Sequence, residues 1–180
     1  MSCCAAEVHI RFSALERLLA QQLFSEDGRR YVRGDKNAKC SFAWLEKPRV
    51  SGEDGKLLVR AKFTGRTAVD VFGRCVGLGD SFDVKITALP YFDKGHIALK
   101  DVEATPESHS GFYAGRVCAA LASSLRREFR FSIGAEAKRA LEDPGTQPAY
   151  PRELRRFSVP RMYVTNDALA VVLDFHVVVK

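Results

Sequence analysis

Cysteine and histidine are the residues of this chain best suited to bind a metal or to act as a nucleophile, and their spacing argues against both. The five cysteines are Cys3, Cys4, Cys40, Cys75 and Cys118. They form no Cys-x-x-Cys motif and no mixed cluster with histidine, which a zinc site would need. Cys75 and Cys118 lie among apolar residues and are interpreted as small buried hydrophobes. The sequence predicts no metal site.

Acid, base and nucleophile positions do not converge either. The four histidines lie on polar strand faces or near turns, and they are His9, His96, His109 and His176. Ser123 and Ser124 stand inside an expected helix, without the glycine-rich elbow that exposes a catalytic serine. The acidic pairs Glu53-Asp54 and Glu142-Asp143 are typical of a turn and a helix end. We therefore expect no catalytic residue, no cofactor and no enzymatic activity.

Binding of phosphate or nucleic acid has only slightly more support in the sequence than metal binding or catalysis. The string from Gly77 to Asp80 joins two expected strands, so we interpret it as a hairpin turn and not as a phosphate loop. The net charge is +6, but charges of both signs are interspersed. A basic rim is formed by the later arginines, which are Arg126, Arg127, Arg130, Arg152, Arg155 and Arg156. Aromatic residues for base stacking are few there, so nucleic acid is an unlikely partner, and the same rim suits an anionic membrane surface.

The hydrophobic pattern changes from strand to helix at the start of the chain. Residues 7–12 alternate between apolar and polar types, which predicts a short strand. Over residues 13–24 leucines recur on one face, which predicts a short amphipathic helix. Ser13 and Glu16 have the spacing of a capping box at the start of this helix.

A long meander is predicted between residues 31 and 104. Apolar residues alternate with polar ones there, and turn signals separate the runs. This pattern predicts a single broad antiparallel sheet with one apolar face. Several runs are longer than the usual strand of about five or six residues, so the apolar face needs a bulky element against it.

Residues 111–129 are predicted to form that element, a long helix. Small residues widen its apolar stripe, and they are Ala114, Cys118, Ala120 and Ala122. Such a stripe predicts burial on more than one side. Small side chains either leave room for a ligand beside the helix or permit close packing on the sheet, and the sequence leaves both alternatives open.

The remaining elements complete one domain. A second short helix is expected over residues 134–143, and a closing strand hairpin turns at Asn166-Asp167. We find no repeat or linker, so a single domain is expected over residues 7–180, behind a flexible N-terminus of residues 1–6.

Three strings carry a resemblance to a known family. They are "ALPYFDKGHIALKDVE" at Ala88–Glu103, "SLRREF" at Ser124–Phe129 and "QPAY" at Gln147–Tyr150. Together with the order of the elements, they resemble a family of bacterial lipoproteins of unknown function related to the tubular lipid-binding (TULIP-like) proteins. The resemblance covers most of the chain from about Val8 onward, and the first string is its most specific part.

The resemblance implies an α+β, TULIP-like fold, in which a long curved antiparallel sheet wraps around the long helix of the C-terminal half. It also implies a hydrophobic cleft between the two that accepts lipid or a fatty-acid-like ligand. From the alternation of each element, the expected cleft residues are Val59, Ala61, Phe63, Phe82, Val84, Ile86, Ile97, Leu99, Tyr113, Val117, Leu121 and Leu125.

Members of that family are tethered to a membrane through a lipidated N-terminal cysteine. Cys3 and Cys4 stand where the first residue of a processed lipoprotein would be. If Met1 and Ser2 replace a removed signal, the protein is a periplasmic, membrane-tethered lipoprotein, and otherwise it is cytoplasmic.

The sequence thus predicts a monomer that binds a lipid or another elongated apolar ligand without turning it over. One alternative is a structural or protein-interaction module with a filled core, and a basic nucleic-acid-binding module is less favoured.

Overall fold

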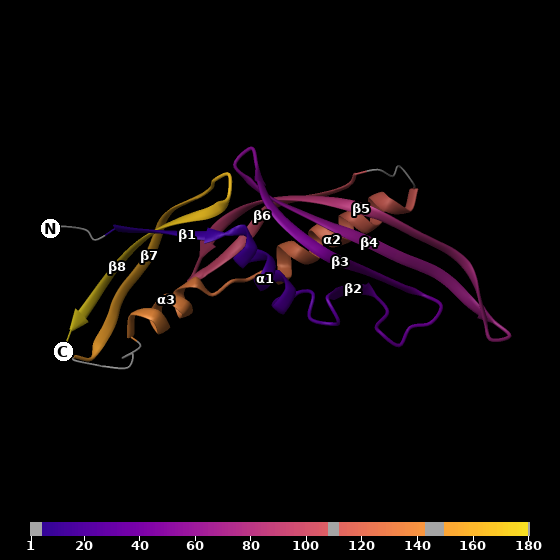
Figure 1. Ribbon diagram of the computed structural model, residues 1–180, viewed down its shortest axis with the longest axis horizontal. Coiled ribbons are helices and arrows are strands. Elements are labelled where there is room, and N and C mark those ends of the chain that lie inside the picture. Colours follow the sequence, from indigo (N-terminus) through magenta and orange to yellow (C-terminus); the bar gives the residue numbers. More distant parts are fainter. Residues whose placement is uncertain (1–4, 108–111, 143–149, 180) are drawn as a thin grey trace.

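The computed structural model describes residues 5–107, 112–142 and 150–179 of the chain. Strands account for more than half of the described residues and helices for about a quarter, so the protein is mostly β. The molecule is elongated (Figure 1), with both chain termini near one end and a long strand hairpin forming the other end.

The larger of two sheets is the predicted meander. Its order is β2-β3-β4-β5-β6, and each neighbouring pair is antiparallel. Its strands are β2 (Arg29–Arg33), β3 (Phe42–Glu53), β4 (Lys56–Val71), β5 (Arg74–Asp93) and β6 (His96–Pro106). The sheet is curled along its length (Figure 1), as the predicted curved antiparallel sheet requires.

A second sheet, which the sequence did not predict, joins the two ends of the chain. Its order is β1-β8-β7, with β1 (Ala5–Arg11), β7 (Arg152–Val164) and β8 (Ala168–Val179). The predicted turn between β7 and β8 is present. The pairing of β1 with β8 connects segments more than a hundred residues apart, so no local pattern could have indicated it.

The expected arrangement of a sheet wrapped around a long C-terminal-half helix is also wrong. The described residues form three short helices: α1 (Phe12–Gln22), α2 (Phe112–Glu128) and α3 (Ile133–Glu142). In α2 one side is buried through Ala114, Cys118 and Leu121, whereas Ala120 and Gly115 are exposed. Because one side of α2 faces solvent, the sheet does not surround it, and the small residues of its outer side were misread as part of a buried stripe.

The predicted capping box at the start of α1 does not form. Arg11 is the N-cap residue, and no side chain caps the helix. The Glu16 carboxylate instead accepts a hydrogen bond of 2.8 Å from the backbone N–H of Val50 in β3. Glu16 therefore fixes α1 to the sheet and does not close the helix start.

The hairpin turn predicted at Gly77–Asp80 lies elsewhere. The ladder between β4 and β5 continues without interruption past these residues to Val71 and Arg74, and the chain reverses at Phe72-Gly73. A Cβ atom on Gly77 would lie 2.2 Å from the carbonyl oxygen of Thr67. Glycine at this position thus permits close approach within a continuous pair of strands and does not mark a turn.

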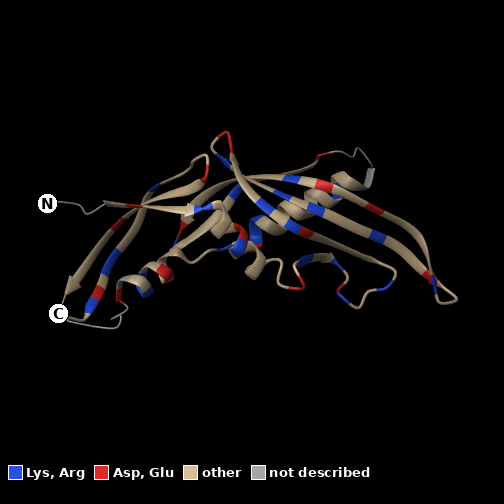
Figure 2. Ribbon diagram, viewed as in Figure 1, with Lys and Arg blue, Asp and Glu red and all other residues tan. Residues whose placement is uncertain are grey.

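One hydrophobic core connects the helices and both sheets. Phe63 and Val84 from the large sheet, Leu121 from α2 and Leu169 and Val171 from β8 are almost completely inaccessible to solvent. Charged residues of both signs are interspersed along the strands and helices (Figure 2). This core holds α1 and α2 against the same face of the large sheet, where the candidate site lies.

Candidate functional site

An apolar pocket lies between α1, α2 and the inner face of the large sheet. The free space inside it is about 60 Å³, so an elongated ligand can enter only if the lining side chains move. The lining residues are Leu15, Leu19, Leu23, Phe24, Arg30, Val32, Leu45, Val50, Leu57, Val59, Ala61, Ile86, Ala88, Ile97, Leu99, Leu121, Ser124, Leu125, Glu128, Phe129, Phe131 and Leu169.

Polar side chains contribute to the lining through Arg30 of β2 and through Ser124 and Glu128 of α2. Arg30 forms an ion pair with Glu128. The Ser124 hydroxyl donates a hydrogen bond of 2.6 Å to the other carboxylate oxygen of Glu128. These three side chains are partly exposed, and they form a small polar rim beside an otherwise aliphatic and aromatic surface. The pocket can therefore hold an apolar group with a polar end at this rim.

Most of the predicted cleft residues on the strands reach the pocket. Those that line it are Val59, Ala61, Ile86, Ile97 and Leu99 on the strands and Leu121 and Leu125 on α2. Phe63, Phe82 and Val84 face the same side but are packed into the core beyond the pocket. Val117 of α2 packs against the core, and the side chain of Tyr113 lies outside the described residues.

Sequence reasoning missed the contribution of α1. Leu15 and Leu19 of α1 line the pocket, as does Leu23, the C-cap residue of this helix. Their spacing on one helix face was visible in the sequence, but periodicity does not reveal which surface an apolar face covers. Leu57 and Ala88 were missed as well. Each lies two residues from a predicted cleft residue, Val59 on β4 or Ile86 on β5, and therefore points to the same face of the sheet.

His9, His96 and His176 do not line the pocket. The described residues contain no group of three or more His, Cys, Asp or Glu side chains placed to hold a metal ion. The ring of His9 contacts the Glu7 carboxylate at 2.7 Å, and His96 contacts the Lys94 carbonyl oxygen at 3.1 Å. Of the remaining candidates from the sequence, His109 and Asp143 lie outside the described residues.

Of the two cysteines interpreted as buried hydrophobes, Cys118 fits that interpretation and Cys75 does not. Cys40, before β3, forms a disulfide with Cys75 at the start of β5. Cys75 is therefore not a buried free thiol. Cys118 does fit that interpretation, since it is buried and burial raises the pKa of its thiol. Cys3 and Cys4 lie outside the described residues.

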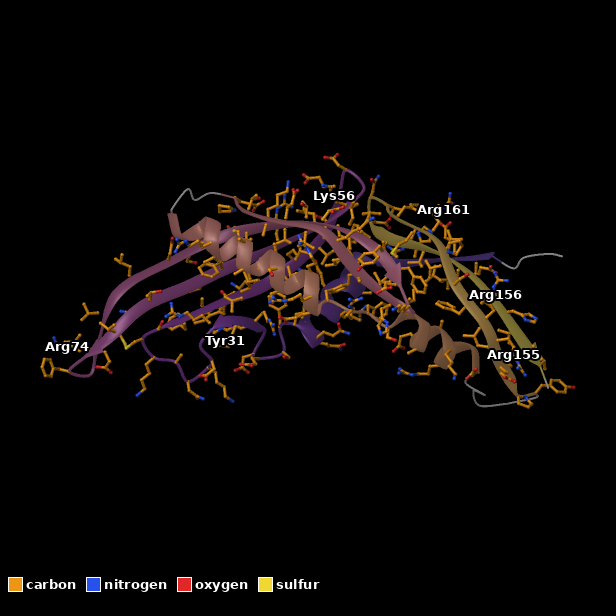
Figure 3. All side chains as sticks on the ribbon, turned by 180° about the vertical axis from the view of Figure 1, so that it is seen from behind. Tyr31, Lys56, Arg74, Arg155, Arg156 and Arg161 are labelled. Carbon is orange, nitrogen blue, oxygen red and sulfur yellow. A yellow bond between two sulfur atoms is a disulfide. The ribbon has the colours of Figure 1, made fainter. Side chains whose placement is uncertain are left out.

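The later arginines do not form one rim. Arg126, Arg127 and Arg130 lie at or just after the end of α2, whereas Arg155 and Arg156 project from β7 at another part of the molecule (Figure 3). Arg130 contacts Asp93 at 3.2 Å, Arg155 contacts Glu153 at 3.0 Å, and Arg156 contacts Asp174 at 3.7 Å. Because these three arginines pair with nearby carboxylates, the positive charge available to bind an anionic partner is smaller than the sequence suggested.

No protein-family model matches this chain, and no curated protein shows significant similarity to it. Within the described residues, the helices are too short or too polar to cross a membrane.

Proposed function

We propose that the protein is a non-catalytic binder of a lipid or another elongated amphiphile. The apolar tail would occupy the pocket between α1, α2 and the large sheet, with the polar end at the rim formed by Arg30, Ser124 and Glu128. The observation that carries this proposal is the almost uniformly apolar lining of a partly open pocket. Soluble domains normally fill such a surface with their own side chains.

The chemistry of the pocket favours an amphiphile over a compact polar ligand. Each methylene group removed from water contributes roughly 0.8 kcal/mol, so even a short acyl segment supplies useful affinity. The polar rim supports the same assignment, because a head group there can exchange hydrogen bonds with Ser124 or Glu128 without entering the apolar space.

We also propose that the protein acts at the bacterial cell envelope and is related to the lipoproteins that its sequence resembles. The disulfide between Cys40 and Cys75 supports this location, because disulfides persist in oxidising compartments such as the periplasm. Lipidation of Cys3 or Cys4 is part of this proposal. Mass spectrometry of the protein isolated from its own organism tests it, since a modified terminal cysteine would support the tether and an unmodified Met1 terminus would contradict it.

Two adjacent serines in α2 provide a matched test of the pocket. Ser124 lines the mouth, whereas Ser123 is exposed and is not part of the lining. The variant Ser124→Trp should obstruct the mouth with a bulky ring that remains partly in solvent, so the core is not overpacked. Ser123→Trp introduces the same ring on the outer side of the helix.

Binding of a fluorescent fatty acid to the protein, first stripped of bound lipid, is the measurement. We expect saturable binding to the wild type and to Ser123→Trp, and a loss of about tenfold or more in affinity for Ser124→Trp. Equal melting temperatures would show that both variants fold. Absence of saturable binding to the wild type would contradict the proposal and favour a structural or interaction module with a filled core.

A further inference from the structure

The tip of the β4–β5 hairpin exposes an unusual group of apolar side chains. The exposed fractions are 103% for Phe72, 86% for Leu78, 66% for Val69, 59% for Val76 and 42% for Val71. The hairpin projects beyond α1 and α2 to the end of the molecule that lies opposite the chain termini (Figure 1). A contiguous apolar surface of this kind on a soluble domain normally marks a contact with another molecule or with a membrane.

The four strand residues of this group, Val69, Val71, Val76 and Leu78, share one face of the hairpin. Val69 pairs with Val76, and Thr67 pairs with Leu78, in a ladder that has no register shift from Leu57 to Arg74. Because side chains alternate along a strand, this face is the same one that carries Ala61 and Val59 to the pocket. The apolar inner face of the sheet therefore continues past the helices to the tip.

Phe72, at the apex of the hairpin, is a poor residue for the turn in which it lies. Phe72 has φ 51° and Gly73 has φ 76°, so both residues of the two-residue turn are left-handed. Such turns strongly prefer Asn or Asp followed by Gly, and a bulky side chain at positive φ is strained. Because Phe72 is strained and fully exposed, it does not stabilise the turn, and its presence there suggests a different role.

Basic residues outnumber acidic ones in the segments near the apolar tip. Arg74 lies at the extreme end of the hairpin (Figure 3). The disulfide from Cys75 to Cys40 ties the hairpin to the loop that contains Lys36 and Lys39, and so holds these lysines near the tip. Residues 33–40 and 66–80 together carry five basic and three acidic side chains. An apolar apex with a net positive surround matches the chemistry of an anionic membrane surface.

We propose that the β4–β5 hairpin inserts its tip, with Phe72 leading, into the interface of an anionic lipid bilayer. A protein partner or a second copy would cover the flat face of the hairpin, but neither requires an aromatic residue at the apex. This inference does not depend on a lipid in the pocket, since membrane docking can occur with the pocket empty.

Replacement of Phe72 by Asn separates membrane binding from folding. Asn-Gly is the preferred sequence for this turn, so Phe72→Asn should fold at least as well as the wild type. The control is Val179→Asn, which removes an apolar side chain that is 60% exposed at the other end of the molecule. Neither residue lines the pocket.

Co-sedimentation with vesicles of phosphatidylglycerol and phosphatidylcholine is the measurement. We expect binding by the wild type and Val179→Asn, weaker binding to phosphatidylcholine alone, and a loss of about tenfold or more for Phe72→Asn. Brominated lipids should also quench the added fluorescence of Phe72→Trp but not that of Val179→Trp.

Three results would overturn the proposal. They are failure of both vesicles to retain the wild type, vesicle binding by Phe72→Asn equal to that of the wild type, and an effect of the substitution on self-association alone. Fatty-acid binding by Phe72→Asn should remain normal in every case, which distinguishes failure of the membrane contact from failure of the pocket assignment.

Discussion

Cys40 and Cys75 are joined by a disulfide that connects the loop before β3 to the start of β5, 35 residues later in the chain. The bond lies close to the exposed end of the β4–β5 hairpin, where no helix of the described residues covers the strands. It therefore restrains a part of the sheet that the core does not hold.

Removal of this disulfide should destabilise the protein. For the variant Cys40→Ser/Cys75→Ser we expect the free energy of unfolding to fall by about 2–4 kcal/mol, because the unfolded chain gains freedom when the loop is opened. Urea unfolding of the oxidised protein and the variant measures the difference. Peptide mapping without reductant provides the check, and alkylation of Cys40 and Cys75 in the unreduced, denatured protein would contradict the assignment.

Gly52 is required by a close contact between the two sheets. A Cβ atom on Gly52 would lie 2.6 Å from the carbonyl oxygen of Thr165 and 2.8 Å from a methyl carbon of Val164. Since the first of these is a backbone atom, Gly52→Ala should lower the free energy of unfolding by about 1–3 kcal/mol.

Gly115 provides the matched control in the same protein. It lies on the exposed side of α2, and a Cβ atom there would meet nothing within 4 Å. Gly115→Ala should raise the free energy of unfolding by about 0.5–1 kcal/mol, because alanine is a better helix former. Chemical denaturation of both variants measures the two effects, and equal effects of both substitutions would argue against the close packing at Gly52.

Glu7 and Tyr163 are coupled across the small sheet. The Tyr163 hydroxyl donates a hydrogen bond of 2.9 Å to Glu7, and this bond, followed by the contact with His9, lowers the pKa of Glu7. The same bond raises the pKa of Tyr163. The contribution of Glu7 to stability is therefore present above the ordinary carboxyl pKa of about 4.3 and is lost as the pH falls through its lower folded value.

Tyr163 contributes stability through the same hydrogen bond while its hydroxyl is neutral. This stability is fully present below the ordinary tyrosine pKa of about 10, and it is lost as the pH rises through the higher pKa of Tyr163 in the folded protein. In Tyr163→Phe the NMR titration midpoint of Glu7 should move to higher pH. An unchanged midpoint would mean that the hydrogen bond does not form in solution.

The order of the elements could be predicted from the sequence because it depends on local periodicity. The meander, the closing hairpin and the three helical segments all appear where apolar residues recur with the matching period. The pairing of β1 with β8 and the position of the Phe72-Gly73 turn depend on contacts distant in sequence or on register, which alternation alone does not fix.

The candidate site could be predicted in part for the same reason. Alternation identified Val59, Ala61 and Ile86 on the inner face of the sheet, and these residues line the pocket. It did not identify Leu15 or Leu19, because the partner surface of an amphipathic helix is set by tertiary packing. The error about α2 arose from Ala120, a small residue that fits a buried stripe and an exposed helix face equally well.

Native mass spectrometry of the protein, purified without detergent, tests the central proposal most directly. We predict that the wild type carries or takes up a lipid-sized molecule in a fixed ratio after exposure to a lipid extract, and that Ser124→Trp does so to a much smaller extent. A clean mass of the unliganded wild-type protein, unchanged by the extract, would contradict lipid binding in the pocket.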